Sequence, residues 1–476
     1  MTDWTQPARP YAIAHRGASA YAPDNTLAAF ALASRLGADM WEVDIRVSRD
    51  GKVIAFHDKI LSDGRKIVDL DYKDILAHTT AELRPCPLLD DVIALAATLG
   101  TGIYADIKDN AATLPTLNAL KHHEIHHAIL GAFDPEAAKI LEEADSPYPR
   151  SVLVPLGAEP FDYAKGTDVI HLCWERMERP QDTLTPEMFE RAFAANQRIA
   201  IWHEEDPIRM AAIRTKPVIG ICSDRPEMVN PMGKDLPFEV VCHRGANQVA
   251  PENTLPALEC ALAAGFGFIE VDLHITADDE IVVFHDPTLE RTTNGFGAVT
   301  SQTLAQLRGL DAGGWFSRHF IGTQIPTLGE TLELLHKYNA KAYLELKSAP
   351  PLPVWQAVQA AGLEDRVFFW SFNTDAIREM RQIAPKAQLM ARRQDYPSLA
   401  TTFADYDPQI IEFTLTEGTD DFAATRADGR RVMVATQKRD TDTLTQVIHA
   451  APDMANIDAP FEIATLIASL RADCHD

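Results

Sequence analysis

The chain has 476 residues and a formal net charge of −25 at pH 7, with 69 acidic against 44 basic side chains. This length exceeds that of one ordinary domain, and the negative charge disfavours binding to nucleic acid or to an anionic membrane surface, since both select for basic patches. A small anionic substrate stays compatible with this charge, because a bound metal ion and one arginine can reverse the field locally.

No apolar run reaches the roughly 18 residues that a transmembrane helix needs. The first ten residues also lack the charged-then-apolar order of a signal peptide. The cysteines form no CxxC pattern; they are Cys86, Cys173, Cys222, Cys242, Cys260 and Cys474. We therefore expect reduced thiols in a cytoplasmic protein with no integral membrane segment.

The first half opens with an apolar run that ends at a short polar motif. Residues 11–14 predict a strand that leads into His15 and Arg16, and an Ala/Leu-rich helix follows and ends near Gly37. Residues 40–47 predict a second strand, on which an E-x-D pair points to one face.

After a turn, residues 53–56 predict a returning strand that delivers His57 at its end. Helical stretches then alternate with apolar runs. These runs predict strands near residues 102–107, 127–132, 150–154, 168–172, 198–202 and 218–222.

The second half repeats the first. The stretch from His15 to Asp58 recurs from His243 to Asp286 at a constant offset of 228 residues, and 19 of the 44 aligned positions are identical. The matches concentrate in HRG, AP-x-NTL, E-V-D and FHD, which hold chemically functional residue types rather than generic core. Strands are predicted near residues 238–242, 268–273, 342–346, 366–370, 387–391, 409–413, 431–435 and 455–457.

Eight strands that alternate with helices in each half predict two tandem (β/α)8 barrels of the TIM type. The alternative is a doubly wound sheet, which would usually carry a glycine-rich phosphate turn after its first strand, and neither half has one. The Pro/Gly break in NPMGKD, residues 230–235, marks the join. We expect the first barrel in residues 1–232 and the second in residues 233–476.

The halves differ in length after the second strand. The interval from His285 to Glu345 is 11 residues longer than the interval from His57 to Asp106. The extra length predicts a longer insert over the mouth of the second barrel. The insert holds an aromatic cluster, Trp315, Phe316 and Phe320. Packing of this cluster within the insert is favoured over a lid for a substrate's alkyl group.

Functional groups gather at the carboxyl ends of strands in a parallel barrel. In the second half, the acids Glu270, Asp272 and Glu345 offer three hard oxygen ligands, which suit Ca²⁺ or Mg²⁺. An arginine and a lysine can bind a phosphate, and two histidines can act as general base and general acid. These are Arg244, Lys347, His243 and His285. Together they support phosphoryl transfer assisted by one metal ion.

The first half holds a counterpart of every member of this set. The counterparts are His15, Arg16, Glu42, Asp44, His57, Asp106 and Lys108. A single strand-end histidine or E-x-D pair is more often structural or solvated. Ordinary solvated faces do not keep their charges in such register, so the duplication favours the functional interpretation.

Longer motifs link these residues. The second half reads HRG, APENT, E-V-D, VVFHDPTLERTTNG, LDAGGWFS, IPTLGETLELL and YLELK, and the first reads HRG, APDNT, E-V-D, FHD, D-I-K and SDRP. Both halves resemble the glycerophosphodiester phosphodiesterase family. The resemblance implies a (β/α)8 barrel, a divalent cation, and hydrolysis of glycerophosphodiesters to sn-glycerol 3-phosphate and an alcohol. By position it implies metal ligands at Glu270, Asp272 and Glu345, an acid/base pair at His243 and His285, and phosphate contacts from Arg244 and Lys347.

Each half departs from the family pattern. The first carries Asp106 in place of a Glu, and this shorter side chain would shift a metal ligand by about an ångström unless the backbone compensates. Its insert is also truncated. The first half keeps a family-like Trp202, whereas residues 434–436 of the second half are Val-Ala-Thr and hold no Trp.

The leading hypothesis is a metal-dependent phosphodiesterase that acts on a small-molecule glycerophosphodiester. In this hypothesis the second barrel is active, and so is the first. One alternative is a degenerate first barrel that binds phosphodiesters or stabilises the second. Another is a lysophospholipid or a sugar phosphodiester as substrate. The spacing is compatible with attack by a glycerol hydroxyl through a cyclic phosphate and with direct attack by water, and it leaves the oligomeric state open.

Overall fold

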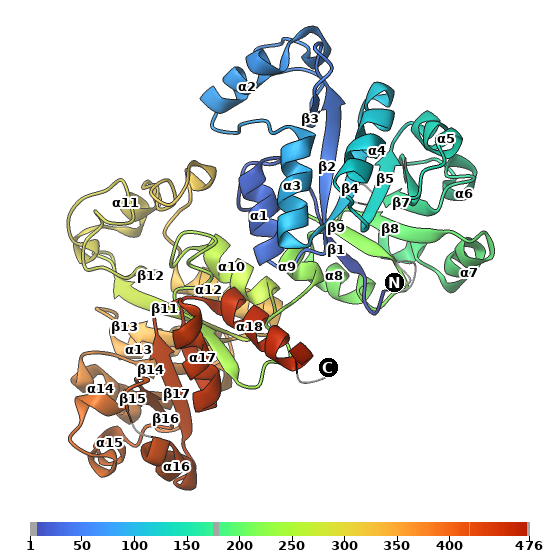
Figure 1. Cartoon of the computed structure of the whole chain (residues 1–476). Helices are drawn as coiled ribbons and strands as arrows, with labels where there is room; N and C mark the ends of the chain where they lie inside the picture. The colour runs from blue at the N-terminus through green and yellow to red at the C-terminus, as the bar shows by residue number, and fades with distance from the viewer. Residues whose placement is uncertain (1–6, 175–179, 418, 474–476) are drawn as a thin grey trace. The chain divides into compact units, whose positions relative to one another are not determined.

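A computed structural model describes residues 7–174, 180–417 and 419–473. The chain divides into two compact units, residues 1–230 and residues 231–476. Figure 1 draws the first unit in blue to green and the second in green to red, and each unit is described by itself below.

The first unit is a closed barrel of eight parallel strands. The order around the barrel is β1-β9-β8-β7-β6-β5-β4-β2, and β2 pairs again with β1. The strands are β1 (Tyr11–Ala14), β2 (Met40–Val47), β4 (Gly102–Ile107), β5 (Ala128–Ala132), β6 (Arg150–Val154), β7 (Val169–Cys173), β8 (Arg198–Trp202) and β9 (Gly220–Ser223). The short strand β3 (Val53–Ala55) pairs antiparallel with β2.

Helices connect these strands and surround them (Figure 1). They are α1 (Leu27–Arg35), α2 (Tyr72–Ala81), α3 (Leu89–Leu99), α4 (Thr113–His122), α5 (Pro135–Glu143), α6 (Pro160–Tyr163), α7 (Pro186–Ala194), α8 (Pro207–Ile213) and α9 (Pro226–Val229). Single 3₁₀ turns lie at Ile67–Asp69, Asn110–Ala112 and Pro180–Thr183.

The second unit repeats this topology, with the order β10-β18-β17-β16-β15-β14-β13-β11 and closure between β10 and β11. Its strands are β10 (Glu239–Cys242), β11 (Phe268–Ile275), β13 (Lys341–Leu346), β14 (Val367–Trp370), β15 (Gln388–Arg392), β16 (Ile410–Phe413), β17 (Arg431–Thr436) and β18 (Met454–Ile457). The strand β12 (Ile281–Val283) returns antiparallel to β11. The prediction of two tandem (β/α)8 barrels is therefore confirmed.

The helices of the second barrel also alternate with its strands. They are α10 (Leu255–Ala263), α11 (Leu304–Arg308), α12 (Leu328–Tyr338), α13 (Pro351–Ala360), α14 (Thr374–Ile383), α15 (Leu399–Tyr406), α16 (Thr419–Ala427), α17 (Thr441–Ala450) and α18 (Pro460–Asp473). Single 3₁₀ turns lie at Val299–Ser301, Arg318–Phe320, Glu364–Arg366 and Arg393–Asp395.

The turn after the first strand of each barrel depends on a glycine. Arg16 and Gly17 have φ of 57° and 86°, and Arg244 and Gly245 have φ of 57° and 81°, which is the left-handed region. A Cβ at Gly17 would lie 2.6 Å from the carbonyl carbon of Ala29 in α1. The HRG motif therefore lets the strand end approach the next helix closely, and this fixes the position of the preceding histidine.

The segment between β12 and α12 forms the longer insert expected in the second barrel. Its apolar side chains make a separate small core that includes Leu289, Val299 and Leu307. Phe320 is buried, and its ring lies 5.7 Å from that of Phe316. Trp315 keeps 43% of its surface exposed. The predicted packing within the insert is thus seen for Phe320, while Trp315 also faces solvent.

Five of the six cysteines lie in the part of the chain that the structure describes, and all five are buried. Cys474 lies outside the described residues. Among the described residues, no helix is both long and apolar enough to cross a membrane.

Candidate active site

Three buried carboxylates meet at the carboxyl ends of β11 and β13. Asp272 pairs with Glu345 across the two strands, and Glu270 lies on the same face two positions earlier. One oxygen from each lies within 4.8 Å of the others. The three side chains that the sequence predicted as metal ligands are therefore brought together.

The electrostatics of this carboxylate cluster suit a hard cation. Burial, followed by the charges of Asp272 and Glu345, raises the pKa of Glu270 well above its ordinary value. The second oxygen of Glu270, Oε1, is buried without a hydrogen-bond partner. A divalent ion would neutralise this charge and satisfy that oxygen, so the residues fit Ca²⁺ or Mg²⁺.

Two cations border the cluster. Lys347 Nζ lies 3.1 Å from Asp272 Oδ1 and also contacts Glu345. Arg244 Nε lies 3.5 Å from Asp272 Oδ2, and its Nη1 donates to Glu252 at 2.9 Å. Both side chains are mostly buried, so their charge is concentrated in the barrel mouth, where an anionic phosphate could replace part of the carboxylate contact.

Each predicted acid/base histidine is held by a carboxylate. His243 Nδ1 lies 2.7 Å from Asp458 Oδ1, and its Nε2 lies 4.0 Å from Glu270. His285 Nδ1 lies 2.5 Å from Asp286 Oδ1. These contacts fix the ring orientation and leave Nε2 as the nitrogen for proton exchange. Burial lowers the pKa of His285, although Asp272 and Asp286 act to raise it.

The structure adds residues that sequence reasoning did not single out. Asn253 Nδ2 donates to Asp272 Oδ2 at 2.7 Å and thereby holds the central carboxylate. His243 is held by Asp458, His285 by Asp286, and Arg244 by Glu252. Asn253 and Glu252 lie inside APENT and Asp286 inside FHD, so these motifs were the available signal for three of the four, whereas Asp458 lies in none of the motifs that carried the resemblance.

The first barrel builds the same arrangement. Glu42, Asp44 and Asp106 are buried, and one oxygen from each lies within 4.8 Å of the others. Asp44 pairs with Asp106 across β2 and β4 in the register that Asp272 and Glu345 share. The shorter Asp106 therefore still joins the cluster. Burial, Asp44 and Asp106 raise the pKa of Glu42 well above its ordinary value, as in the second barrel.

The cations and histidines of the first barrel also match those of the second. Arg16 Nε lies 3.0 Å and Lys108 Nζ 2.9 Å from Asp44. His15 Nδ1 lies 2.7 Å from Asp224, and His57 Nδ1 lies 2.8 Å from Asp58. All seven predicted residues of the first half thus gather at one barrel mouth.

The aromatic residues around the two mouths differ. In the first barrel, Trp202 Nε1 donates to His15 Nε2 at 3.2 Å, and its ring lies 5.6 Å from that of Phe133. In the second barrel the rings of Trp370 and Phe372 lie 4.5 Å apart, and the guanidinium of Arg392 lies over both. Phe133 follows β5 and Phe372 follows β14, which have matching places in the two barrels, and a lysine Nζ lies over each ring. The difference is therefore the tryptophan, which comes from β8 in the first barrel and from β14 in the second.

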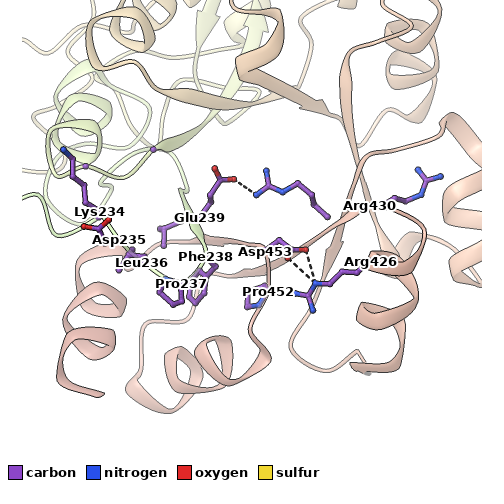
Figure 2. Close-up of a pocket in the computed structure, with 16 residues that line it drawn as sticks. Lys234, Asp235, Leu236, Pro237, Phe238, Glu239, Arg426, Arg430, Pro452 and Asp453 are labelled. Carbon is purple, nitrogen blue, oxygen red and sulfur yellow. Dashed lines mark hydrogen bonds and ion pairs between the residues drawn. The ribbon is translucent and has the colours of Figure 1, made fainter. Parts of the chain in front are cut away.

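A separate open hollow of about 840 Å³ lies at the amino-terminal ends of β10, β17 and β18. Figure 2 shows Glu239 and Asp453 there, each joined to an arginine side chain. This is the opposite end of the barrel from the carboxylates. Catalytic groups of such barrels lie at the carboxyl ends of strands, so we assign the chemistry to that end rather than to this hollow.

Buried acids flanked by cations and by oriented histidines, set in (β/α)8 barrels, define the class of barrel phosphoric diester hydrolases. A model of the glycerophosphoryl diester phosphodiesterase family matches residues 15–228 and 243–453. The chain belongs to this family, with two family domains in tandem. The resemblance predicted from the motifs is confirmed.

Individual relatives show the same kinship. A glycerophosphodiester phosphodiesterase of Caldanaerobacter subterraneus subsp. tengcongensis is 34% identical over 192 residues, which is 36% of this chain and 79% of the relative. A probable glycerophosphodiester phosphodiesterase 1 of Mycobacterium tuberculosis is 48% identical over 169 residues, 31% of this chain and 61% of the relative. A glycerophosphodiester phosphodiesterase from Agrobacterium tumefaciens, known from a crystal structure, is 34% identical in sequence, with a TM-score of 0.46. The match covers 48% of this chain and 99% of that chain.

Proposed function

We propose that both barrels, in the domains 1–232 and 233–476, hydrolyse glycerophosphodiesters to sn-glycerol 3-phosphate and an alcohol. The observation that carries this proposal is the duplicated set of buried acids, clamping cations and carboxylate-held histidines. Family membership supplies the substrate class. The buried thiols support a cytoplasmic location.

In each barrel the acidic cluster would hold one Ca²⁺ or Mg²⁺ ion, through Glu270, Asp272 and Glu345 or through Glu42, Asp44 and Asp106. When bound, such an ion supplies Lewis-acid stabilisation of the charge that develops on the phosphoryl oxygens. The side chains of the protein perform the other steps.

Arg244 and Lys347 bind the phosphate. Both cations contact Asp272 in the structure, so they converge on one point of the mouth. A planar guanidinium and an ammonium on two sides of a phosphate fix its orientation and offset its charge before the reaction begins. Arg16 and Lys108 have the same arrangement around Asp44.

The two histidines move protons. One imidazole accepts the proton of the attacking hydroxyl or water, and the other donates a proton to the departing alkoxide. The carboxylates on Nδ1 of His243 and His285 keep each ring turned so that Nε2 is the exchanging atom. The lowered pKa of His285 keeps that imidazole neutral near pH 7 and ready to accept a proton.

A degenerate first barrel is the second candidate. The shortened Asp106 favoured it at the level of sequence, but the conserved register and the common 4.8 Å grouping support an equivalent cluster in both barrels. We therefore propose two active sites.

The test follows release of glycerol 3-phosphate from glycerophosphocholine, with and without EDTA. The variants are His57→Ala, His285→Ala and the double variant. We expect each single variant to keep the activity of the other barrel, and the double variant and chelation each to lower the rate by at least ~10³-fold. Activity that survives the double substitution or chelation would overturn the mechanism. An unchanged rate in His57→Ala on every diester tried would make the first barrel a partner.

The same four proteins, given a lysophospholipid and a sugar phosphodiester, test the alternative substrates. We expect slower release from both than from the glycerophosphodiester. Detection of a cyclic glycerol phosphate in the quenched reaction distinguishes attack by the glycerol hydroxyl from direct attack by water.

A further inference from the structure

A second group of metal-ligand types lies beside the carboxylate cluster of the first barrel. Ligand atoms of His15, His203 and Asp224 all lie within 4.8 Å of one another. His15 follows β1, Asp224 follows β9 and His203 follows β8, and these three strands are consecutive in the barrel. The group therefore forms at the same carboxyl end as the proposed active site.

The distances fit a small tetrahedral ion after slight adjustment. His15 Nδ1 lies 2.7 Å and His203 Nε2 lies 3.8 Å from the two oxygens of Asp224. Ligands at ~2.0–2.1 Å from a tetrahedral zinc ion lie roughly 3.3 Å apart. The two separations, each to a different oxygen of Asp224, differ from this value by about half an ångström.

The donor set differs in kind from the cluster next to it. Two imidazole nitrogens and one carboxylate oxygen suit zinc and similar borderline ions, and they match the three-ligand composition of many zinc sites with a further position open. Glu42, Asp44 and Asp106 offer oxygen alone, which suits Ca²⁺ or Mg²⁺. The first barrel thus presents two neighbouring sites of different chemical preference.

The charge around Asp224 favours a cation. Glu205 accepts a hydrogen bond from the backbone N–H of Asp224 at 2.7 Å and from Ser223 at 2.8 Å, both on Oε1. Its Oε2 is buried and has no hydrogen-bond partner among the described residues. A positive ion bound to Asp224 would lower the free-energy cost of burying the Glu205 carboxylate.

The second barrel lacks the third ligand. Trp202 pairs with Cys222 of β9, and Ala435 pairs with Asn456 of β18, so these two pairs have matching places in the two barrels. Thr436 follows Ala435 and therefore lies where the first barrel has His203. Asp458, the counterpart of Asp224, has the guanidinium of Arg439 3.2 Å away. A protein cation therefore lies at the carboxylate oxygen that corresponds to the one facing His203 in the first barrel.

We propose that His15, His203 and Asp224 form a zinc-class binding site in the first barrel, and that its occupation inhibits that barrel while the second stays active. Binding to His15 Nδ1 would replace the contact with Asp224 that orients the ring. The ring's single proton would then lie on Nε2, so Nε2 would have no lone pair with which to act as a base and could no longer accept from Trp202. The inhibitory consequence rests on the proposed catalytic role of His15, whereas the binding site itself does not.

Binding is tested on the full chain by equilibrium dialysis against Zn²⁺ in excess Mg²⁺, which competes for the oxygen-only clusters. We expect the wild type to retain about one more zinc ion per chain than His203→Thr, which installs the residue of the second barrel, and than His203→Gln. Visible absorption of Co²⁺ in place of zinc should show an intense tetrahedral band only in the wild type. Equal metal content and equal spectra in wild type and both variants would overturn the site.

Inhibition is tested with one barrel silenced. In His285→Ala, which reports the first barrel, we expect stoichiometric Zn²⁺ to lower hydrolysis at least ~10-fold, and in His57→Ala, which reports the second, less than ~2-fold. Adding His203→Thr to His285→Ala should abolish the inhibition. Equal inhibition of both barrels, or inhibition that survives His203→Thr, would overturn the regulatory part. If neither single variant hydrolyses a diester, the proposed function fails while the dialysis still decides the metal site.

Discussion

At the residue scale, the same device recurs four times: a carboxylate on Nδ1 of a candidate histidine. Asp458 and Asp286 serve the second barrel, and Asp224 and Asp58 serve the first. An imidazole held in this way keeps one tautomer and one orientation, so its Nε2 is already placed when substrate arrives.

Asp458→Asn, in the His57→Ala background, tests this positioning. The amide keeps the volume but can present its NH₂ to Nδ1, which favours the wrong tautomer. We expect kcat to fall at least ~10²-fold with a much smaller change in KM. Steady-state kinetics check the split between kcat and KM. A fall confined to KM would mean that Asp458 shapes the substrate pocket instead.

The third candidate metal ligand differs by one methylene between the barrels, and this offers a matched pair of substitutions. In the His57→Ala background we expect Glu345→Asp to lose less than ~10-fold in activity, since Asp106 reaches the cluster from the same register. Glu345→Gln, with an almost identical shape and no charge, should lose at least ~10²-fold. Titration of activity with Mg²⁺ shows whether the loss follows ion affinity.

At the element scale, the turn between the first strand and the first helix positions the site. Gly245 has φ of 81°, and a Cβ there would lie 2.7 Å from the carbonyl carbon of Ala257 in α10. The backbone N–H of the preceding Arg244 donates to Glu270 at 2.8 Å. The close packing of this turn therefore fixes both Arg244 and Glu270, a candidate metal ligand.

Gly245→Ala should destabilise the second barrel by more than ~2 kcal/mol, because it combines left-handed strain with a clash against backbone. Gly362→Ala is the control. Gly362 also has a positive φ, of 64°, but nothing lies within 4 Å of its added Cβ, so only the conformational strain of about 1 kcal/mol applies. Urea unfolding measures both. Equal losses would show that the contact with α10 does not matter.

At the scale of the whole molecule, two compact units each hold a complete set of candidate groups. Sites that share no residues should act independently. The rate of the wild type on a common substrate should therefore equal the sum of the rates of His57→Ala and His285→Ala, each measured at saturating substrate. A sum that departs from the wild-type rate by more than ~2-fold would indicate coupling between the barrels.

The end of the second barrel opposite to its site contributes to stability through ion pairs. Glu239, which Figure 2 labels, lies at the start of β10; it contacts Lys341 at 2.6 Å and also Arg431, so it links β10 to β13 and β17. Burial acts to raise the pKa of Glu239, but the hydrogen bonds from Lys341 and Arg431 hold it below its ordinary value of 4.5.

A carboxylate with a depressed pKa stabilises the fold above its unfolded pKa, and this contribution is lost as the pH falls through the folded pKa. We therefore expect Glu239→Gln to lower the urea midpoint at pH 7, and the difference from the wild type to shrink below about pH 4.5. The surface variant Glu379→Gln is the control for removal of an exposed charge. A difference that is constant with pH would assign the effect to packing rather than to the ion pairs.

The amino-acid sequence by itself determined the duplication, the class of fold and the chemical identity of the site. Alternation of apolar runs with helical stretches is a local property of the sequence. The two acids of E-x-D are two positions apart on one strand and therefore share a face. Both features could be read from the sequence alone. The motifs also contained the residues that hold His285 and Asp272 in place, whereas Asp458, which holds His243, lies outside them.

Only the tertiary structure decided which of those residues touch. Asp458 and His243 are 215 positions apart, and closure of the barrel between β18 and β10 is what makes them neighbours. In the first barrel, the pairing of β9 with β1 and with β8 brings His15, His203 and Asp224 together, and Thr436 has the matching place in the second barrel. The register of β2 with β4 likewise decided that the shorter Asp106 reaches the cluster, because side-chain length matters only relative to the backbone that carries it.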